Sequence, residues 1–535
     1  MGWDPSFIRD LADSTVEPKF LLRFNSMPDF IGGVTVVSGG YNQQGPSIEK
    51  RGPTFRGVSV IPQTWNVSFG GFSVPICGDI TTLFPTVRRG SLAELYVDLN
   101  GIVERVAIGQ LRQIRGYGSN WNLEFVDLIT AMTARASGQV GTAFDGNDPD
   151  EFSYFPLVGK EQEITSNWFA SGTVFPTTIS VDDVRPFQDV ETGGYRVAKV
   201  TSASNVEFFV RYDSTSITSF PAGVLNLSFV HATIITVYPG INSCVNAATG
   251  SKITSVGMLN GKTWEIFAKI LLSRDGQNVN TYDKYKKLSN FGAFLNTNLF
   301  DTGDAAAQTY IKSSNPSSVV YEWSYVFFSA WNNGIRTFVD AAAQTGQWPT
   351  WRQNSLSWRG CQDPDQASTI AGSITDHDII SIDNIDIFDP NNKSTFYNSK
   401  NTYGLQTGGT VLSNAKTQTF GEAQFLPADS FKERDLKYIY KPDPNTDATN
   451  RLRCSIGDIN RLFEWDTRLW SKIKLRVKMN YAKLTAGDIV EIKSTYLTTF
   501  KNSTIPNTIY RAMVINVGWS FMSSSCTLEL AILLK

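Results

Sequence analysis

The sequence contains very little histidine and few cysteines. Its 535 residues include two histidines, His231 and His377, which are too few for a three-histidine zinc site and provide little base for a serine or cysteine nucleophile. The five cysteines are widely spaced and contain no CxxC pair. A secreted disulfide framework would need denser, even-numbered cysteines. We therefore expect no metal, no cofactor, and cysteines that are reduced and mostly buried.

Long apolar runs are also missing. No stretch approaches the length of about 18 apolar residues that a membrane span needs, and the first residues include acidic side chains instead of a signal-peptide core. The 48 basic residues nearly balance the 50 acidic residues, which gives a net charge of -2. A chain that is nearly neutral overall has no net charge that would attract it to nucleic acid or to a membrane surface. We expect a protein made in a cytosol, without export by a cleaved signal and without stable membrane insertion.

Aromatic residues and β-strand patterns are abundant. The 34 phenylalanines, 19 tyrosines and 13 tryptophans are ample for packed cores. In Ile473–Met479 apolar residues alternate with cations, which is the period of a strand with one buried face. Asn100–Gly101 between two β-rich runs predicts a tight hairpin, and Gly487–Asp488 predicts a turn into a further strand. The fold is therefore predicted to be mainly β with some α.

The length implies several domains, because a single core stops growing well below 535 residues. We expect tube-type β-barrel domains at the two ends, residues 1–136 and 390–535. Ser-, Thr- and Val-rich strands predict an inserted β-sandwich at 137–240, and a mixed α/β region is expected at 241–389.

Two helices are predicted in the middle region. Two sets of apolar residues follow helical spacing: Trp264, Phe267, Ala268 and Leu271, and, at every fourth position, Trp323, Phe327, Trp331 and Ile335. Gly-, Asn- and Ser-rich residues 391–414 predict a long surface excursion.

Few side chains are candidates for chemistry. His377 lies between Asp376 and Asp378, but we interpret these carboxylates as caps of backbone amides in a turn. His231 lies in a strand pattern and is interpreted as structural. The acidic loop Asp145–Glu151 lacks the EF-hand pattern and is interpreted as solvated. We therefore predict that the protein is not an enzyme.

A cluster of aromatic and basic residues is the strongest candidate for binding. Trp348, Trp351 and Trp358 lie close to Arg352 and Arg359 in the sequence. Flat amphipathic side chains of this kind suit an interface anchor or a sugar-stacking platform. The alternative, which we favour, is a tryptophan-filled seam between domains.

Four passages form an ordered set along the chain. The first is an Arg-Gly turn with two following strands, at Val87–Tyr96 and Trp121–Leu128. The second is an aromatic and aliphatic helix pattern at Trp264–Leu272, with Tyr282–Asp283 and Phe291–Gly292 downstream. The third is a Thr-Asp-His-Asp turn at Ile374–Ile380, and the fourth is a strand, a Gly-Asp turn and a second strand at Arg476–Ile492. In this order the passages resemble the tail-tip or baseplate hub proteins of long-tailed bacteriophages.

The resemblance implies a structural virion protein. Such a hub is a homotrimer whose two barrels per chain form a pseudo-sixfold ring that joins the tail tube to the distal tip and forms part of the DNA channel. Its implied partners are the tail tube or distal tail protein, the tape-measure protein and tip or fibre proteins, with DNA only in transit. The implied location is the tail tip of the virion, assembled in the host cytoplasm. The extra section at 137–240 departs from this pattern.

Two alternatives belong to other classes. A receptor- or carbohydrate-binding tail adhesin would also be β-rich, nearly neutral and poor in catalytic residues. Fibre-like adhesins usually contain repeats or a long shaft, and this sequence contains neither. A tail-associated glycosidase is the third interpretation, because the spacing of carboxylates along a sequence does not exclude a catalytic pair.

Overall fold

The computed structural model describes most of both chain ends and parts of the middle. The described residues are 3–24, 36–37, 47–49, 52–62, 64–80, 87–127, 129–130, 159–170, 176–187, 196–203, 207–227, 245–261, 267, 323–327, 334–344, 346–352, 355–367, 369–388, 394–398, 418–419, 431–435, 439–440, 465, 470–497 and 509–533.

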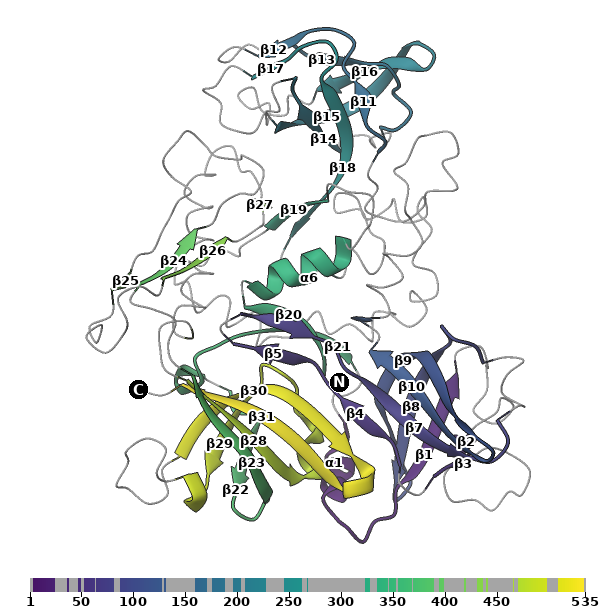
Figure 1. The fold of residues 1–535 in the computed structure, drawn as a ribbon, viewed down its shortest axis with the longest axis vertical. Helices are drawn as coiled ribbons and strands as arrows, with labels where there is room; N and C mark the ends of the chain where they lie inside the picture. The colour runs from purple at the N-terminus through teal and green to yellow at the C-terminus, as the bar shows by residue number, and fades with distance from the viewer. Residues whose placement is uncertain are drawn as a thin grey trace.

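One 14-stranded sheet contains strands from both ends of the chain (Figure 1). Its N-terminal part is formed by β1 (Lys19–Phe24), β2 (Val36–Val37), β3 (Ser47–Ile48), β4 (Thr54–Arg56), β7 (Gly71–Cys77), β8 (Leu92–Leu99), β9 (Ile102–Tyr117) and β10 (Asn120–Asp127). Its C-terminal part is formed by β22 (Gly372–Thr375), β23 (Ile379–Phe388), β28 (Trp470–Lys478), β29 (Ile489–Lys493), β30 (Ile509–Ser520) and β31 (Ser525–Leu533).

The two parts join at β4, which pairs with β7 on one side and with β30 on the other. The ring of Phe55 stacks on Trp519 with centroids 5.0 Å apart, and Phe20 meets Phe521 edge to face at 4.8 Å. Gly52, at φ +66°, lies where a Cβ would come within 2.8 Å of Phe20 and Phe521, so only glycine fits. One buried apolar cluster therefore extends across both parts of the sheet.

The sequence predicted a separate tube-type barrel at each end. Among the described residues neither part closes on itself, because no pairing joins the end strands of either part, and β4 instead connects one part to the other. The C-terminal part also includes β22 and β23, which precede residue 390. The prediction of a mainly β fold is confirmed, whereas the strands form one shared sheet in place of two closed barrels.

The local β signals read from the sequence are confirmed. Asn100 and Gly101 adopt φ values of 53° and 86° in the hairpin between β8 and β9, as a two-residue primed turn requires. In β28 the side chains of Ile473, Leu475 and Val477 are buried, whereas Arg476 is exposed. Gly487, at φ +100°, ends the turn that leads into β29.

A second, 8-stranded sheet has its own buried core. It is drawn at the opposite end of the molecule from the 14-stranded sheet (Figure 1). Its strands are β11 (Gln162–Glu163), β13 (Thr178–Val181), β14 (Arg196–Thr201), β15 (Glu207–Ser219), β16 (Ala222–Leu227), β18 (Lys252–Gly261), β19 (Trp323–Phe327) and β27 (Ile439–Tyr440), with the ribbon β12 (Trp168–Ala170) and β17 (Val245–Ala247) beside them. This sheet thus extends beyond the 137–240 section into later parts of the chain.

One of the two predicted middle helices is wrong. Residues 323–327 form strand β19, paired with β18, because the segment Trp-Ser-Tyr-Val-Phe is rich in the aromatic and β-branched residues that strands favour. The helix in this region, α6 (Gly334–Gln344), begins seven residues after β19 ends and includes an alanine run. Of the other predicted helix only Phe267 is described, and it is buried.

The remaining elements are short. They are α1 (Pro5–Leu11), the hairpins β5 (Ser59–Ile61) with β6 (Asn66–Ser68) and β20 (Gln347–Arg352) with β21 (Ser355–Gly360), the small sheet β24 (Ser394–Asn398), β25 (Gln418–Thr419) and β26 (Phe431–Asp435), and the 3-10 turns η3 (Pro364–Gln366), η5 (Met479–Lys483), η6 (Thr495–Leu497) and η7 (Phe521–Ser523). Across the described ranges, no helix has the length and apolar character needed to cross a membrane.

Candidate functional site

The predicted aromatic cluster lies in the β20–β21 hairpin, which packs on the C-terminal part of the large sheet (Figure 1). Strand β30 is buried on both faces: Val514 belongs to the main core, whereas Met513 and Ile515 belong to a second apolar cluster. Two indoles of this second cluster, Trp65 from the loop before β6 and Trp348 from β20, meet over the sheet. We call this second cluster the tryptophan seam.

Three indoles form the centre of the tryptophan seam. Trp65 stacks on Trp348 with ring centroids 6.2 Å apart and meets Trp465 edge to face at 6.0 Å. The indole Nε1 of Trp348 donates to the backbone oxygen of Ala486 at 3.3 Å, and that of Trp465 donates to Gln362 at 3.0 Å. The contacts connect β5–β6, β20–β21 and the C-terminal part of the sheet.

A buried ion pair reinforces the same contact. The Arg359 guanidinium lies 3.1 Å from the Asp488 carboxylate, and each side chain is only 7% exposed. Asp488 also accepts a hydrogen bond from the Thr485 amide at 3.0 Å, and the hydroxyl of Thr350 bonds to the hydroxyl of Thr485. Arg359 is the cross-strand partner of Trp348, so the hairpin directs its indole and its cation at one face of the C-terminal strands.

Trp358 belongs to a different contact. Its ring lies 5.3 Å from Phe267 and 6.3 Å from Phe338 of α6, and its Nε1 donates to Gln347 at 3.3 Å. Trp348 and Trp358 are 0% and 2% exposed, so protein atoms cover both rings. The side chain of Arg352 lies outside the described residues. The described arrangement is that of an interior seam that holds elements together.

Trp351 approaches a fully buried carboxylate, Asp127, at the end of β10. Burial raises the pKa of Asp127 to about 7, while the Ile129 amide, which donates to it at 2.7 Å, and the Trp351 indole oppose this rise. The C-terminal end of β10 and the β20–β21 hairpin therefore meet at a protonatable group.

Sequence reasoning missed several partners in the tryptophan seam. Trp65, Trp465 and Asp488 lie far from the β20–β21 hairpin along the chain, and no local pattern pairs them with it. The one available signal was the number of tryptophans, because such large side chains need a core to bury them.

The carboxylates around His377 are caps, as predicted. Asp378 accepts hydrogen bonds from the Thr375 amide at 2.9 Å and from its hydroxyl at 2.7 Å. Asp376 accepts from the Thr495 hydroxyl at 2.7 Å, and hydrogen bonds from Ser494 and Thr495 hold its pKa below the usual range. His231 and the loop 145–151 lie outside the described residues. Within the described part of the chain, no group of three His, Cys, Asp or Glu residues is placed to hold a metal ion.

Comparisons with known proteins give similarities to solved structures. No protein-family model matches the chain, and no curated protein matches it either. A tail protein from Neisseria meningitidis is 10% identical, with 96% of each chain covered and a TM-score of 0.38. The 43 kDa tail protein of prophage MuSo2 from Shewanella oneidensis is 8% identical, with 97% of this chain and 98% of that chain covered and a TM-score of 0.37.

A third similarity is to a chain of the virion of a native gene transfer agent particle. It is 10% identical and covers 54% of this chain and 90% of that chain, with a TM-score of 0.17. The similar structures are thus two tail proteins, one of them from a prophage, and a component of a virion. At these TM-scores they carry no function over to this chain.

Proposed function

We propose that this chain is a structural virion protein, the hub of a bacteriophage tail tip or baseplate, and not an enzyme. In this proposal a homotrimer forms a ring that joins the tail tube, or a distal tail protein, to the tip or fibre proteins. The ring surrounds part of the channel through which the tape-measure protein and DNA pass. The ordered hub-like passages in the sequence motivate the proposal.

The observation that carries the proposal is the sharing of one sheet by the two ends of the chain. Along the main strand order, this sheet has β2 at one end and β23 at the other, and among the described residues each pairs with one strand only. A sheet whose two ends differ can continue from one subunit to the next in a heterologous contact, which closes a ring when the rotation is suitable. Such a contact supports a cyclic assembly.

Strand β23 has the features of an edge that a neighbouring subunit covers. It is ten residues long, and Ile380 and Ile387 are 54% and 61% exposed. Long edge strands with exposed apolar side chains are otherwise aggregation sites, which natural proteins avoid or cover. Coverage by a second copy removes both side chains from water.

The experiment replaces the apolar side chains of this edge. Ile380→Glu with Ile387→Glu should shift the purified protein from ring to monomer in light scattering at micromolar concentration. Ile217→Glu is the control, because Ile217 is 63% exposed on β15 of the other sheet. A wild-type monomer, or a ring that tolerates the β23 variant as well as the control, would contradict the proposal.

A further inference from the structure

The turn between β8 and β9 contains an asparagine followed by a glycine, Asn100 and Gly101, and both residues are exposed. Because glycine has no Cβ, its backbone nitrogen reaches the side chain of the preceding residue with little steric hindrance. Among the described residues, no atom lies within 4 Å of the place that a Cβ on Gly101 would occupy. The turn therefore has both the residues and the space for an intramolecular reaction of the Asn100 side chain.

The reaction converts the Asn100 amide to a carboxylate. The Gly101 nitrogen gives up its proton to hydroxide and forms a bond to Cγ of Asn100, while the Cγ–Nδ2 bond breaks and Nδ2 takes up a proton and leaves as ammonia. Water then opens the five-membered imide at either carbonyl carbon, which leaves aspartate or isoaspartate at position 100. The Gly101 N–H donates to the side chain of Asp98 at 2.8 Å, so its release leaves the strand pairing intact.

The Asn100 amide holds a buried carboxylate on the first helix. Its Nδ2 donates to Oδ2 of Asp10 at 2.9 Å, and Asp10 is only 6% exposed. The other oxygen of Asp10 accepts from Nε of Arg9 at 2.9 Å. Hydrogen bonds from Asn100 and then from Arg9 hold the pKa of Asp10 below its usual range. The amide thus compensates one side of a carboxylate that has little contact with water.

The helix that carries Asp10, α1, connects the two parts of the large sheet. It packs against β8 and β9 of the N-terminal part and against η5 of the C-terminal part (Figure 1). Phe7 of this helix is fully buried in the cluster that spans both parts. Trp3, just before the helix, donates from Nε1 to the backbone oxygen of Arg105 at 3.0 Å. The Asn100–Asp10 contact therefore helps to hold α1 where the two ends of the chain meet.

A carboxylate at position 100 removes this contact. It has no N–H to donate, and it places a second negative charge at a position 2.9 Å from the Asp10 oxygen. Two carboxylates at this distance cannot both be charged without a cost. Arg9 is 74% exposed and already bonds to Asp10, so it compensates one of the two charges. Isoaspartate adds a methylene to the backbone of the turn as well.

We propose that Asn100 is a site of spontaneous deamidation, and that its acidic product releases α1 from the β8–β9 hairpin. This modification goes beyond the proposed role in a ring, because it uses no residue of the β23 edge. It gives the chain an age-dependent loosening of the contact between its two ends.

Peptide mapping by mass spectrometry tests the reaction, after incubation of the full native chain at mildly alkaline pH. Asn260–Gly261 is the matched control, because the same dipeptide lies in β18 and pairs with β19. Asn100 should convert at least about tenfold faster than Asn260, because a hairpin turn opens more often than paired strands. In denaturant the two sites should convert at similar rates. Equal rates in the native chain, or no conversion at Asn100, would overturn the proposal.

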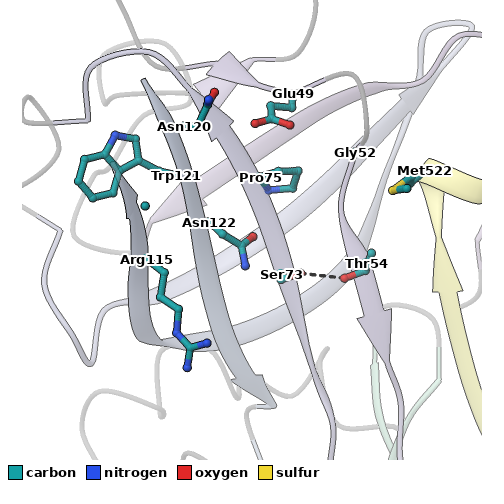
Figure 2. A pocket seen from close by; sticks show the side chains of 11 residues that line it. Glu49, Gly52, Thr54, Ser73, Pro75, Arg115, Asn120, Trp121, Asn122 and Met522 are labelled. Carbon is teal, nitrogen blue, oxygen red and sulfur yellow. Dashed lines mark hydrogen bonds between the residues drawn. The ribbon is translucent and has the colours of Figure 1, made fainter. Parts of the chain in front are cut away.

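Hydrogen exchange over residues 5–11 tests the consequence. Asn100→Asp keeps a residue pair that the turn favours, and it should make α1 exchange about threefold faster or more, as expected for one lost hydrogen bond. Adding Asp10→Asn restores an amide and a carboxylate in exchanged positions, so α1 should return close to the wild-type rate. Asn120→Asp is the control, because Asn120 is exposed at the start of β10, beside Trp121 (Figure 2), and it should leave α1 unchanged.

Two exchange results would overturn the proposed consequence. The first is equal exchange of α1 in Asn100→Asp and Asn120→Asp. The second is exchange that stays as fast in the double variant with Asp10→Asn as in Asn100→Asp alone, which would assign the loosening to the turn itself. Ring formation is measured separately, so failure here leaves the hub proposal standing.

Discussion

Leu475 provides a sharp test of the register of β28 and of the core beneath it. Its side chain is fully buried in the main cluster, and its cross-strand partners are Leu528 on β31 and Ile382 on β23. Truncation of a buried leucine to alanine costs about 2–5 kcal/mol. Leu475→Asp adds a carboxylate without a partner, which costs a further few kcal/mol or forces the group to bind a proton. The combined loss is comparable to the free energy of unfolding of an ordinary domain, which is about 5–15 kcal/mol.

The control is the next residue, Arg476, which is exposed and lies opposite Thr527. Arg476→Asp should change the free energy of unfolding by less than about 1 kcal/mol, because surface substitutions usually have small effects. Hydrogen exchange followed by mass spectrometry measures both variants over residues 470–478.

Exchange should accelerate strongly in Leu475→Asp and stay near wild type in Arg476→Asp. Because one apolar cluster spans both parts of the sheet, peptides from β1 and β7 should also exchange faster in the Leu475 variant. Equal exchange in the two variants would refute the assigned register. Acceleration confined to the C-terminal part would refute the single core.

Three further predictions concern the seam and its neighbours. Arg359→Met leaves Asp488 buried without its partner and should lower the free energy of unfolding of the protein by about 3–5 kcal/mol. Adding Asp488→Asn to this variant should recover part of the loss. Equal melting temperatures of the single and double variants would exclude the ion pair as the cause. Burial raises the pKa of Asp127 from 3.8 to about 7, so the folded state binds this proton more tightly than the unfolded chain, and the free energy of unfolding should fall as the pH rises from about 4 to about 7. Asp127→Asn should flatten that slope in denaturant titrations, and an unchanged slope would assign it to other groups. Gly487→Ala should lower the melting temperature more than Gly250→Ala does. Both glycines have positive φ, but only at Gly487 would the added Cβ meet a neighbour, Arg359, at 3.0 Å. Equal losses in melting temperature would mean that backbone strain accounts for the whole effect.

Local features of the fold could be predicted from the sequence. The strand at Ile473–Met479 and the turn at Asn100–Gly101 are determined by the conformational preferences of adjacent residues, so both can be predicted from a short stretch of sequence. The cap at Asp378 was predictable for the same reason, because its partner Thr375 is three residues away, whereas the partner of Asp376, Thr495, comes from a distant part of the chain. The spacing of four from Trp323 misled because aromatic side chains also favour strands, and pairing with β18 decided the outcome.

Long-range features could not be predicted in the same way. The pairing of β4 with β30 merges the two ends of the chain into one sheet, yet nothing near residues 54–56 specifies a partner near residue 519. The candidate residues Trp348 and Arg359 were found because they cluster in the sequence. Their partners Trp65 and Asp488 were not found, because only the folded chain brings them together.

The central claim is that copies of this chain form a closed ring. Native mass spectrometry of the purified wild-type protein, with negative-stain images of the same sample, tests it most directly. The account predicts a single species of three copies and images of a ring with a central opening. A monodisperse monomer at micromolar concentration, or an open filament of copies without closure, would contradict it.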